Sequence, residues 1–324
     1  MTAQQHLFAN GKLLLTAEYA VLDGATALAL PTKFGQSLDI MPSETTSDLE
    51  WTSFDADGKI WFSATFDFDT FKCKKASDNA VATQLETIFA AALHLKYDNT
   101  VAKNRCFTPP QYLTPFDAKT QLTFPKEWGL GTSSTLIANI ARVFKINPYA
   151  LLAVTFGGSG YDIACATADS PLLFRLENGV PFVENATFLP VFTQNLYFVY
   201  LGKKQNSREG IERYNSRKKA FGQQNTEESF LAEISNLTQV FLTATDLKTF
   251  EKAIVQHEKL IASMVQLPRA KTLYFNDFWG EIKSLGAWGG DFVLATSDRN
   301  AVETKIYLMS KGFETVLTYN EIIL

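Results

Sequence analysis

The segment 129–134 combines glycines and small hydroxyl residues in an order that can bind an anion. It reads Gly129, Leu130, Gly131, Thr132, Ser133 and Ser134, and apolar residues at helical spacing follow it. A glycine turn that opens into a helix brings free backbone N–H groups and the positive end of the helix dipole to one point. The hydroxyl groups can cap the helix, bind phosphate oxygens or ligate a cation. The segment therefore predicts a phosphate-binding loop, with an ordinary helix N-cap as the alternative.

Three further segments contain residues that can do chemistry. Lys12 and Glu18 lie in the segment 10–24, Asp162 follows the glycine cluster 157–160, and a third glycine cluster occupies residues 286–290. An aspartate after such a turn can serve as a general base, or it can simply stabilise the first turn of a helix. The phosphate loop is neither a Walker A motif nor a dinucleotide fingerprint, because the Lys-Ser/Thr pair and the third glycine are missing.

Composition restricts the class of protein. The 324 residues are 46% hydrophobic, and a net charge of −4 argues against a general nucleic-acid binder. The three cysteines form no Cys-x-x-Cys pair, and the three histidines lack metal-ligand spacing. Neither an N-terminal signal pattern nor an apolar run long enough to span a membrane is present. We therefore expect a cytoplasmic protein, monomeric or homodimeric, with no nucleic-acid or membrane partner.

Periodicity predicts an α+β fold. Strands are expected at 49–54 and 60–68, joined by a hairpin loop, and at 120–124, 172–176, 196–201, 291–295 and 313–318. Helices are expected from Ser77 or Asp78 to about Lys96, and at 132–145, 207–221, 226–244, 246–264, 270–284 and 298–311, with another starting at Pro148. Residues 104–117 are predicted to form a loop. A boundary near residue 185 divides the chain into an N-terminal part, 1–185, and a C-terminal part, 186–324.

The four segments together resemble the motifs of the GHMP kinase superfamily, over nearly the whole chain. Gly11-Lys12 and Glu18-Tyr19 resemble the first motif, residues 129–134 resemble the second, and residues 286–290 resemble the third. The segment from Gly158 to Asp162 is similar to the one that carries the catalytic aspartate. The resemblance implies a two-subdomain α+β fold with a ribosomal protein S5 domain 2-like N-terminal part, which binds ATP, and a ferredoxin-like C-terminal part.

The resemblance also implies roles for individual residues in an ATP- and Mg²⁺-dependent phosphotransferase. Residues 129–134 are expected to bind the nucleotide, with Ser133 as a magnesium ligand. Asp162 is expected to be the base for the acceptor hydroxyl, and Lys12 to neutralise the transferring phosphoryl group. The residues expected near the acceptor are Glu18, Lys203, Lys204, Arg208, Gly289 and Gly290.

Short signals favour the phosphomevalonate and mevalonate kinase branch, so the expected acceptor is a small anionic alcohol. They are Glu18-Tyr19, the segment 126–131 and Gly290-Asp291. Asn10, Ala17 and Trp288 depart from the family pattern, and Trp288 stands inside the third glycine cluster, where a small residue is usual. A kinase for a sugar or another small metabolite, and a non-catalytic nucleotide-binding relative, are the alternatives.

Overall fold

The computed structural model describes residues 4–43, 47–97, 115–203, 207–221 and 224–324. These residues form two compact units, each assembled from separate stretches of the chain. The first contains the described parts of Met1–Gly11, Phe34–Lys126 and Gly131–Thr167, and the second those of Lys12–Lys33, Glu127–Leu130 and Ala168–Leu324. The expected boundary near residue 185 stays a prediction.

The first unit is built on a sheet whose hydrogen-bonded order is β5-β4-β3-β6-β2. Its strands are β3 (Asp48–Phe54), β4 (Ile60–Asp67), β5 (Cys73–Ala76), β6 (Phe116–Leu122) and part of β2 (Ala27–Pro42); β1 (Gln5–Leu14) pairs with β2. Strands β3 and β4 form the predicted hairpin. Asp55 fixes its turn, because Asp55 Oδ1 accepts hydrogen bonds from the backbone N–H groups of Asp57 and Lys59, at 3.0 and 2.9 Å.

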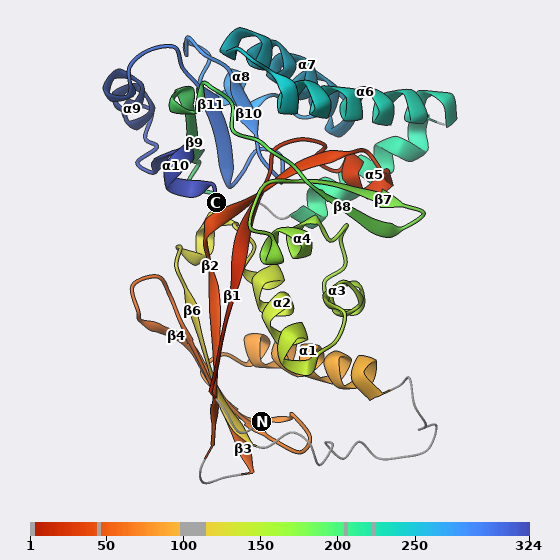
Figure 1. Cartoon of the computed structure of the whole chain (residues 1–324), viewed down its shortest axis with the longest axis vertical. Coiled ribbons are helices and arrows are strands. Elements are labelled where there is room, and N and C mark those ends of the chain that lie inside the picture. Colours follow the sequence, from red (N-terminus) through yellow and green to blue (C-terminus); the bar gives the residue numbers. More distant parts are fainter. Residues whose placement is uncertain (1–3, 44–46, 98–114, 204–206, 222–223) are drawn as a thin grey trace. The chain divides into compact units, whose positions relative to one another are not determined.

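Four helices lie on one side of this sheet (Figure 1). They are α1 (Asn79–Tyr97), α2 (Thr132–Phe144), α3 (Pro148–Thr155) and α4 (Tyr161–Thr167). The predicted caps are confirmed for two of them. Asp78 Oδ1 accepts from the N–H of Ala80 at the start of α1, and Pro148 occupies the first turn of α3.

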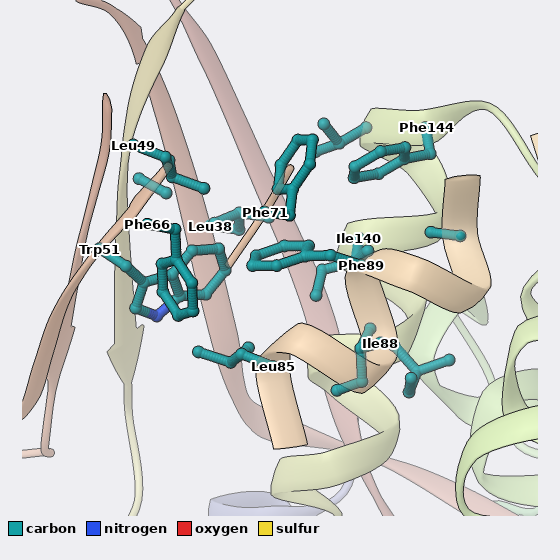
Figure 2. Close-up of a cluster of buried hydrophobic side chains, with 14 of the residues drawn as sticks. Leu38, Leu49, Trp51, Phe66, Phe71, Leu85, Ile88, Phe89, Ile140 and Phe144 are labelled. Carbon is teal, nitrogen blue, oxygen red and sulfur yellow. The ribbon is translucent and has the colours of Figure 1, made fainter. Parts of the chain in front are cut away.

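An apolar core joins the helices to the sheet. Figure 2 shows Phe89 of α1 among Trp51, Phe66 and Phe71, with ring-centroid distances of 5.7, 5.5 and 5.0 Å. Phe144 of α2 extends the cluster, and all five rings are buried. Because each buried aromatic ring contributes about 1.5–3 kcal/mol through the hydrophobic effect, this core holds α1 and α2 on the sheet.

The second unit contains an antiparallel sheet with the strand order β10-β11-β9-β12. Its strands are β10 (Ile282–Ser284), β11 (Phe292–Thr296), β9 (Leu196–Tyr200) and β12 (Val316–Thr318). The hairpin of β7 (Leu172–Glu177) and β8 (Val180–Asn185) pairs with residues Ala27–Ala29 of β2. The helices of this unit are α5 (Ser207–Phe221), α6 (Gln224–Thr243), α7 (Leu247–Val265), α8 (Ala270–Tyr274), α9 (Ala301–Ser310) and α10 (Tyr319–Ile322). Among the described residues, the 3₁₀ turns are η1 (Ala20–Asp23), η2 (Lys126–Trp128) and η3 (Thr193–Asn195).

The predicted helix 270–284 is wrong. Helix α8 ends at Tyr274, and Ile282–Ser284 form strand β10, which pairs with β11. Gly280 explains the change, since a Cβ there would overlap the backbone carbonyl of Thr296 in β11. This close backbone approach requires glycine and an extended chain, so tertiary contact decides the conformation against local helical spacing.

The other expected helices and strands of the second unit lie within a few residues of their predicted positions. In the first unit β6 begins at Phe116 and ends at Leu122, slightly earlier than expected. Most of the expected loop 104–117 lies outside the described residues, and its last two residues belong to β6. The α+β class is confirmed. Among the described helices, none combines the length and the apolar character that crossing a membrane requires.

Candidate active site

Lys12, near the end of strand β1, forms hydrogen bonds to the first residues of the expected phosphate loop. The N–H of Lys12 donates to the carbonyl of Leu130 at 2.9 Å, and Lys12 Nζ donates to the carbonyl of Gly129 at 2.8 Å. Backbone and side chain of one residue therefore bind two consecutive residues of the loop. The structure brings Lys12 and Gly129 together within the second unit, 117 positions apart in the sequence.

The start of α2 has the backbone that the glycine pattern predicts. Gly129 and Gly131 have φ values of 66° and 99°, and Gly131 is the N-cap of α2, with no side-chain cap. Ser134 is buried and donates its hydroxyl to the carbonyl of Gly131 at 2.9 Å, whereas Ser133 is exposed and Thr132 half-buried. Ser134 therefore has a structural partner, and Ser133 presents its side chain to solvent at the positive end of the helix.

An apolar pocket of about 330 Å³ opens beside Thr132 and Ser133 within the first unit. Strands of the sheet contribute Trp51, Trp61 and Thr120 to its wall. Helix α1 contributes Val81, Gln84, Leu85 and Ile88. Two of these residues each contain a buried polar atom, Trp61 Nε1 and Thr120 Oγ1, that has no hydrogen-bond partner among the described residues. Lys126 Nζ lies 4.7 Å from the centroid of the Trp61 ring, so a cation also lies beside this wall.

Asp162 lies in the first turn of α4, in the first unit, and is half-buried. Its Oδ1 accepts a hydrogen bond from the N–H of Ile163 at 3.0 Å. Gly160 precedes it with φ 92°, and a Cβ at Gly160 would press on the ring of Tyr149. Burial, with the charges of Cys165 and Asp162 adding to it, raises the pKa of Tyr149 to about 12, so its phenol stays protonated near neutral pH.

The third glycine cluster is bound to β1 and to the turn that follows it. The N–H of Gly286 donates to the carbonyl of Leu14, and the N–H of Trp288 donates to the hydroxyl of Tyr19 at 2.8 Å. The indole of Trp288 is only 4% exposed and donates to the carbonyl of Pro268 at 3.0 Å. Trp288 therefore anchors the loop to the chain that follows α7, and its side chain is part of the interior of the second unit.

Glu18 belongs to a fully buried network of ionisable side chains in the second unit, defined as Glu18, His257, Glu258 and Lys283. Lys283 Nζ donates to Glu18 Oε1 and lies 3.6 Å from Glu258 Oε1. His257 Nε2 accepts the N–H of Ala17 at 3.0 Å. All four side chains are 0% exposed, so Glu18 has no contact with solvent in this structure. The network fixes the turn after β1 to β10 and α7.

Protonation in this network follows from burial. Burial raises the pKa of Glu18 and lowers that of His257 well below its usual range. His257 is therefore neutral near pH 7, which agrees with its role as an acceptor for a backbone N–H. Burial raises the pKa of Glu258 to about 7, and the Lys283 ammonium opposes part of that shift.

The Glu258→Gln variant is expected to lose a pH dependence of stability. Between the usual value of 4.5 and about 7, the unfolded chain has released the proton of Glu258 while the folded protein retains it. The free energy of unfolding therefore falls as pH rises through this interval. Glutamine keeps an oxygen for the N–H of Ser284, which Glu258 accepts at 3.0 Å. Between pH 5 and pH 8 the free energy of unfolding of wild type should therefore fall, relative to that of the variant, by on the order of 3 kcal/mol. Urea unfolding at both pH values measures this difference. Profiles of unfolding free energy against pH that run parallel for wild type and Glu258→Gln would contradict this. Glu228→Gln, at an exposed position, is the control and should keep the wild-type profile.

The expected acceptor cations are only partly described. Lys203 is exposed, and its Nζ lies 5.7 Å from the centroid of the Tyr274 ring. Lys204 lies outside the described residues, and Arg208 lies in α5 but its side chain is outside the described part. Gly289 and Gly290 lie in the loop between β10 and β11, and Gly289 has φ 84°. The acceptor roles of these residues stay predictions.

A magnesium site made by protein side chains alone is not found in the described part of the chain. No group of three or more histidine, cysteine, aspartate or glutamate side chains lies there in a metal-binding arrangement. The residues present do fit a magnesium ion carried by a nucleotide, because such an ion keeps several waters and needs few protein ligands. The exposed hydroxyl of Ser133 is chemically suited to be one of those ligands, and that role stays a prediction.

The comparisons with known proteins identify the fold. No family model and no curated protein matches the sequence. Among solved structures, a mevalonate kinase from Methanococcus jannaschii has a TM-score of 0.68 at 16% identity, covering 97% of each chain. A Streptococcus pneumoniae phosphomevalonate kinase in complex with phosphomevalonate and AMPPNP gives 0.68 and 16%, covering 97% of this chain and 99% of the other. The Lin0012 protein from Listeria innocua gives 0.70 and 16%, with 97% of each covered. The chain has the GHMP kinase fold.

The GHMP kinase fold confirms the expected fold class. The structure also contains site residues that the sequence did not indicate. Trp61 and Thr120, which line the pocket, appeared in the sequence only as ordinary strand residues. Lys283 was predicted to lie in a helix. The available signal for a short buried strand was the apolar Ile282 before it and the glycine cluster after it. Asp291 was noted as the start of an expected strand and as part of a branch motif, and its carboxylate lies against Gly129.

Proposed function

We propose that this protein is an ATP- and Mg²⁺-dependent small-molecule kinase. It transfers the γ-phosphoryl group of ATP to the hydroxyl group of a small anionic alcohol, mevalonate or 5-phosphomevalonate. The observation that carries the proposal is the apolar pocket beside Thr132 and Ser133, at the N-terminus of α2. The GHMP kinase fold supports the same reaction class.

The pocket suits a flat nitrogen heterocycle such as adenine. Its volume of about 330 Å³ is within the range of small-ligand sites, and aromatic rings line it. Trp61 Nε1 is a buried donor and Thr120 Oγ1 a buried hydroxyl, both without a partner among the described residues. An unsatisfied buried polar group costs about 1–3 kcal/mol, so a ligand gains binding energy if a side-chain adjustment exposes these two groups to its hydrogen-bonding atoms. A nucleobase is flat and offers hydrogen-bonding atoms, and Lys126 adds a cation for the phosphates of the nucleotide.

The chain's own residues then have separate tasks in the transfer. The backbone N–H groups at the start of α2 bind phosphate oxygens, and Ser133 supplies a hydroxyl ligand for the ion. Bound Mg²⁺ neutralises charge on the phosphates during transfer. Asp162 accepts the proton of the acceptor hydroxyl, whose oxygen forms a bond to the γ-phosphorus while the bond to the β–γ bridging oxygen breaks and ADP leaves. Lys12 supplies positive charge to the transferring group.

The nature of the acceptor rests on charge and on the branch signals. Lys203, Lys204 and Arg208 form a basic segment after β9, and such side chains bind carboxylate and phosphate groups. Glu18-Tyr19 and Gly290-Asp291 follow the phosphomevalonate kinase pattern. A carboxylate or a phosphomonoester on the acceptor is the chemistry that matches these cations.

Filling the pocket is expected to weaken nucleotide binding. Val81→Trp, on α1, adds an indole to the pocket wall and removes space for the base, so the affinity for AMPPNP should fall at least about 10-fold. Isothermal titration calorimetry measures the change. Val154→Trp makes the same substitution at an exposed position of α3 and should bind like wild type. Equal affinities of the two variants would show that this pocket does not hold the nucleotide.

The acceptor class is tested by ATP consumption with a panel of alcohols. Mevalonate, 5-phosphomevalonate, homoserine, galactose and glucose are compared at equal concentration, with Mg²⁺ present. The proposal predicts turnover with mevalonate or 5-phosphomevalonate. Turnover of a neutral sugar alone would contradict the anionic acceptor, and binding of nucleotide without turnover of any acceptor would support a non-catalytic relative.

A further inference from the structure

Asp291 places a carboxylate directly against the first glycine of the expected phosphate loop. A Cβ at Gly129 would overlap both oxygens of that carboxylate. Lys12 Nζ donates to the carbonyl of the same glycine at 2.8 Å. All three residues belong to the second unit. Gly129 is therefore contacted by a carboxylate as well as by an ammonium group. A carboxylate is unexpected in a loop that binds phosphate, because the two anions repel each other.

The position of Asp291 is fixed by its backbone. Its N–H donates to the carbonyl of Lys203 at 2.8 Å, and its carbonyl accepts from the N–H of Leu201, also at 2.8 Å. Its φ of 48° lies in the left-handed region, which aspartate, asparagine and glycine tolerate better than other residues. The chain thus holds Asp291 in an uncommon conformation between the third glycine cluster and β11, with its carboxylate on Gly129.

We infer that Asp291 makes the phosphate loop select the magnesium complex of a nucleotide over the metal-free nucleotide. This inference rests on the proposed function, because it assumes that residues 129–134 bind the triphosphate. A carboxylate at Gly129 repels the phosphates of a metal-free nucleotide, and the repulsion is strong in a partly desolvated site. A magnesium ion on the phosphates reverses the sign of the interaction, since Mg²⁺ attracts carboxylate oxygens.

The neighbouring charge supports this division of tasks. Lys12 offers a cation to either form of the nucleotide, so it favours binding without discriminating between them. Asp291 is the group on Gly129 whose interaction changes sign when the metal is present. A discriminating site therefore needs the carboxylate, and glycine at position 129 is needed to let it approach.

The test compares the affinity for AMPPNP in excess MgCl₂ and in excess EDTA, by calorimetry on the full chain. The measured quantity is the ratio of the dissociation constant in EDTA to that in MgCl₂. Asp291→Asn is expected to lower this ratio at least about 10-fold, mainly through tighter binding in EDTA. Asp291→Gly should lower the ratio as well, because it also removes the carboxylate and glycine tolerates the left-handed backbone. A lower ratio in both variants excludes a specific effect of asparagine.

Asp298→Asn is the matched control, because it removes the same charge from an exposed position of the same unit. Its ratio should equal that of wild type, and a shift as large as that of Asp291→Asn would overturn the inference. A ratio that stays within about 3-fold of wild type in both Asp291 variants would overturn it as well. If wild type binds no AMPPNP in either condition, the proposed function fails too; if wild type binds and only the ratios stay unchanged, the inference alone fails.

Discussion

Asp162→Asn should lower turnover at least about 100-fold while AMPPNP binding stays close to that of wild type. The asparagine keeps an oxygen for the N–H of Ile163, which Asp162 Oδ1 accepts at 3.0 Å, so the first turn of α4 is preserved. What is lost is the carboxylate that takes the proton of the acceptor hydroxyl. Steady-state kinetics with the acceptor found by the panel, together with calorimetry for the nucleotide, separates these effects.

Asp169→Asn is the control for this prediction. Asp169 is exposed, lies shortly after α4, and has no proposed role in the reaction. The control variant should have wild-type kcat and KM. Near-wild-type turnover of Asp162→Asn would remove Asp162 from the proposed mechanism, and equal losses in both variants would point to a structural effect at the end of α4.

The Lys283→Met variant should lose about 3–5 kcal/mol of folding stability. Lys283 is fully buried and donates to Glu18, and Glu258 lies 3.6 Å away. Methionine fills a similar volume but leaves the buried Glu18 without its cation, while Glu258 retains the guanidinium of Arg269, whose Nε lies 4.0 Å from its Oε2. The loss is large against a typical total of about 5–15 kcal/mol for a folded domain. Urea unfolding at pH 8, where Glu258 is mostly ionised, measures it.

Two companion variants make the stability test specific. Lys305→Met removes a half-buried surface lysine whose Nζ is 4.0 Å from Glu321, and it should change stability by less than about 1 kcal/mol. Glu18→Gln combined with Lys283→Met should recover part of the loss, because one buried charge is removed with its partner. Equal effects of Lys283→Met and Lys305→Met would show that the buried network does not stabilise the fold.

The features that were predictable from the sequence are those fixed by local chemistry. The hairpin at Asp55, the first turn of α3 at Pro148 and the start of α2 at Gly131 each depend on residues within about one helical turn. The glycine spacing of 129–131 predicts the left-handed backbone there, because other residues adopt it at a cost. Such signals are short and therefore visible in one sequence.

The features that were missed depend on partners far apart in the chain. Glu18 and Lys283 are separated by 265 positions, and neither residue type indicates burial by itself. Strand β10 has three residues, too few for a period, and the close approach of Gly280 to β11 exists only after the sheet forms. The pocket likewise needs Trp61 and Thr120 from different strands and Val81 from α1, and it appears only once those elements are packed.

The most direct test of the proposed reaction is to follow the γ-phosphorus of ATP by ³¹P NMR. Wild-type protein is incubated with MgATP and either mevalonate or 5-phosphomevalonate. A new phosphorus signal from a phosphorylated acceptor should appear in step with ADP, and at least about 100-fold more slowly with Asp162→Asn. ATP that stays intact with both acceptors, or that yields only ADP and inorganic phosphate, would contradict it.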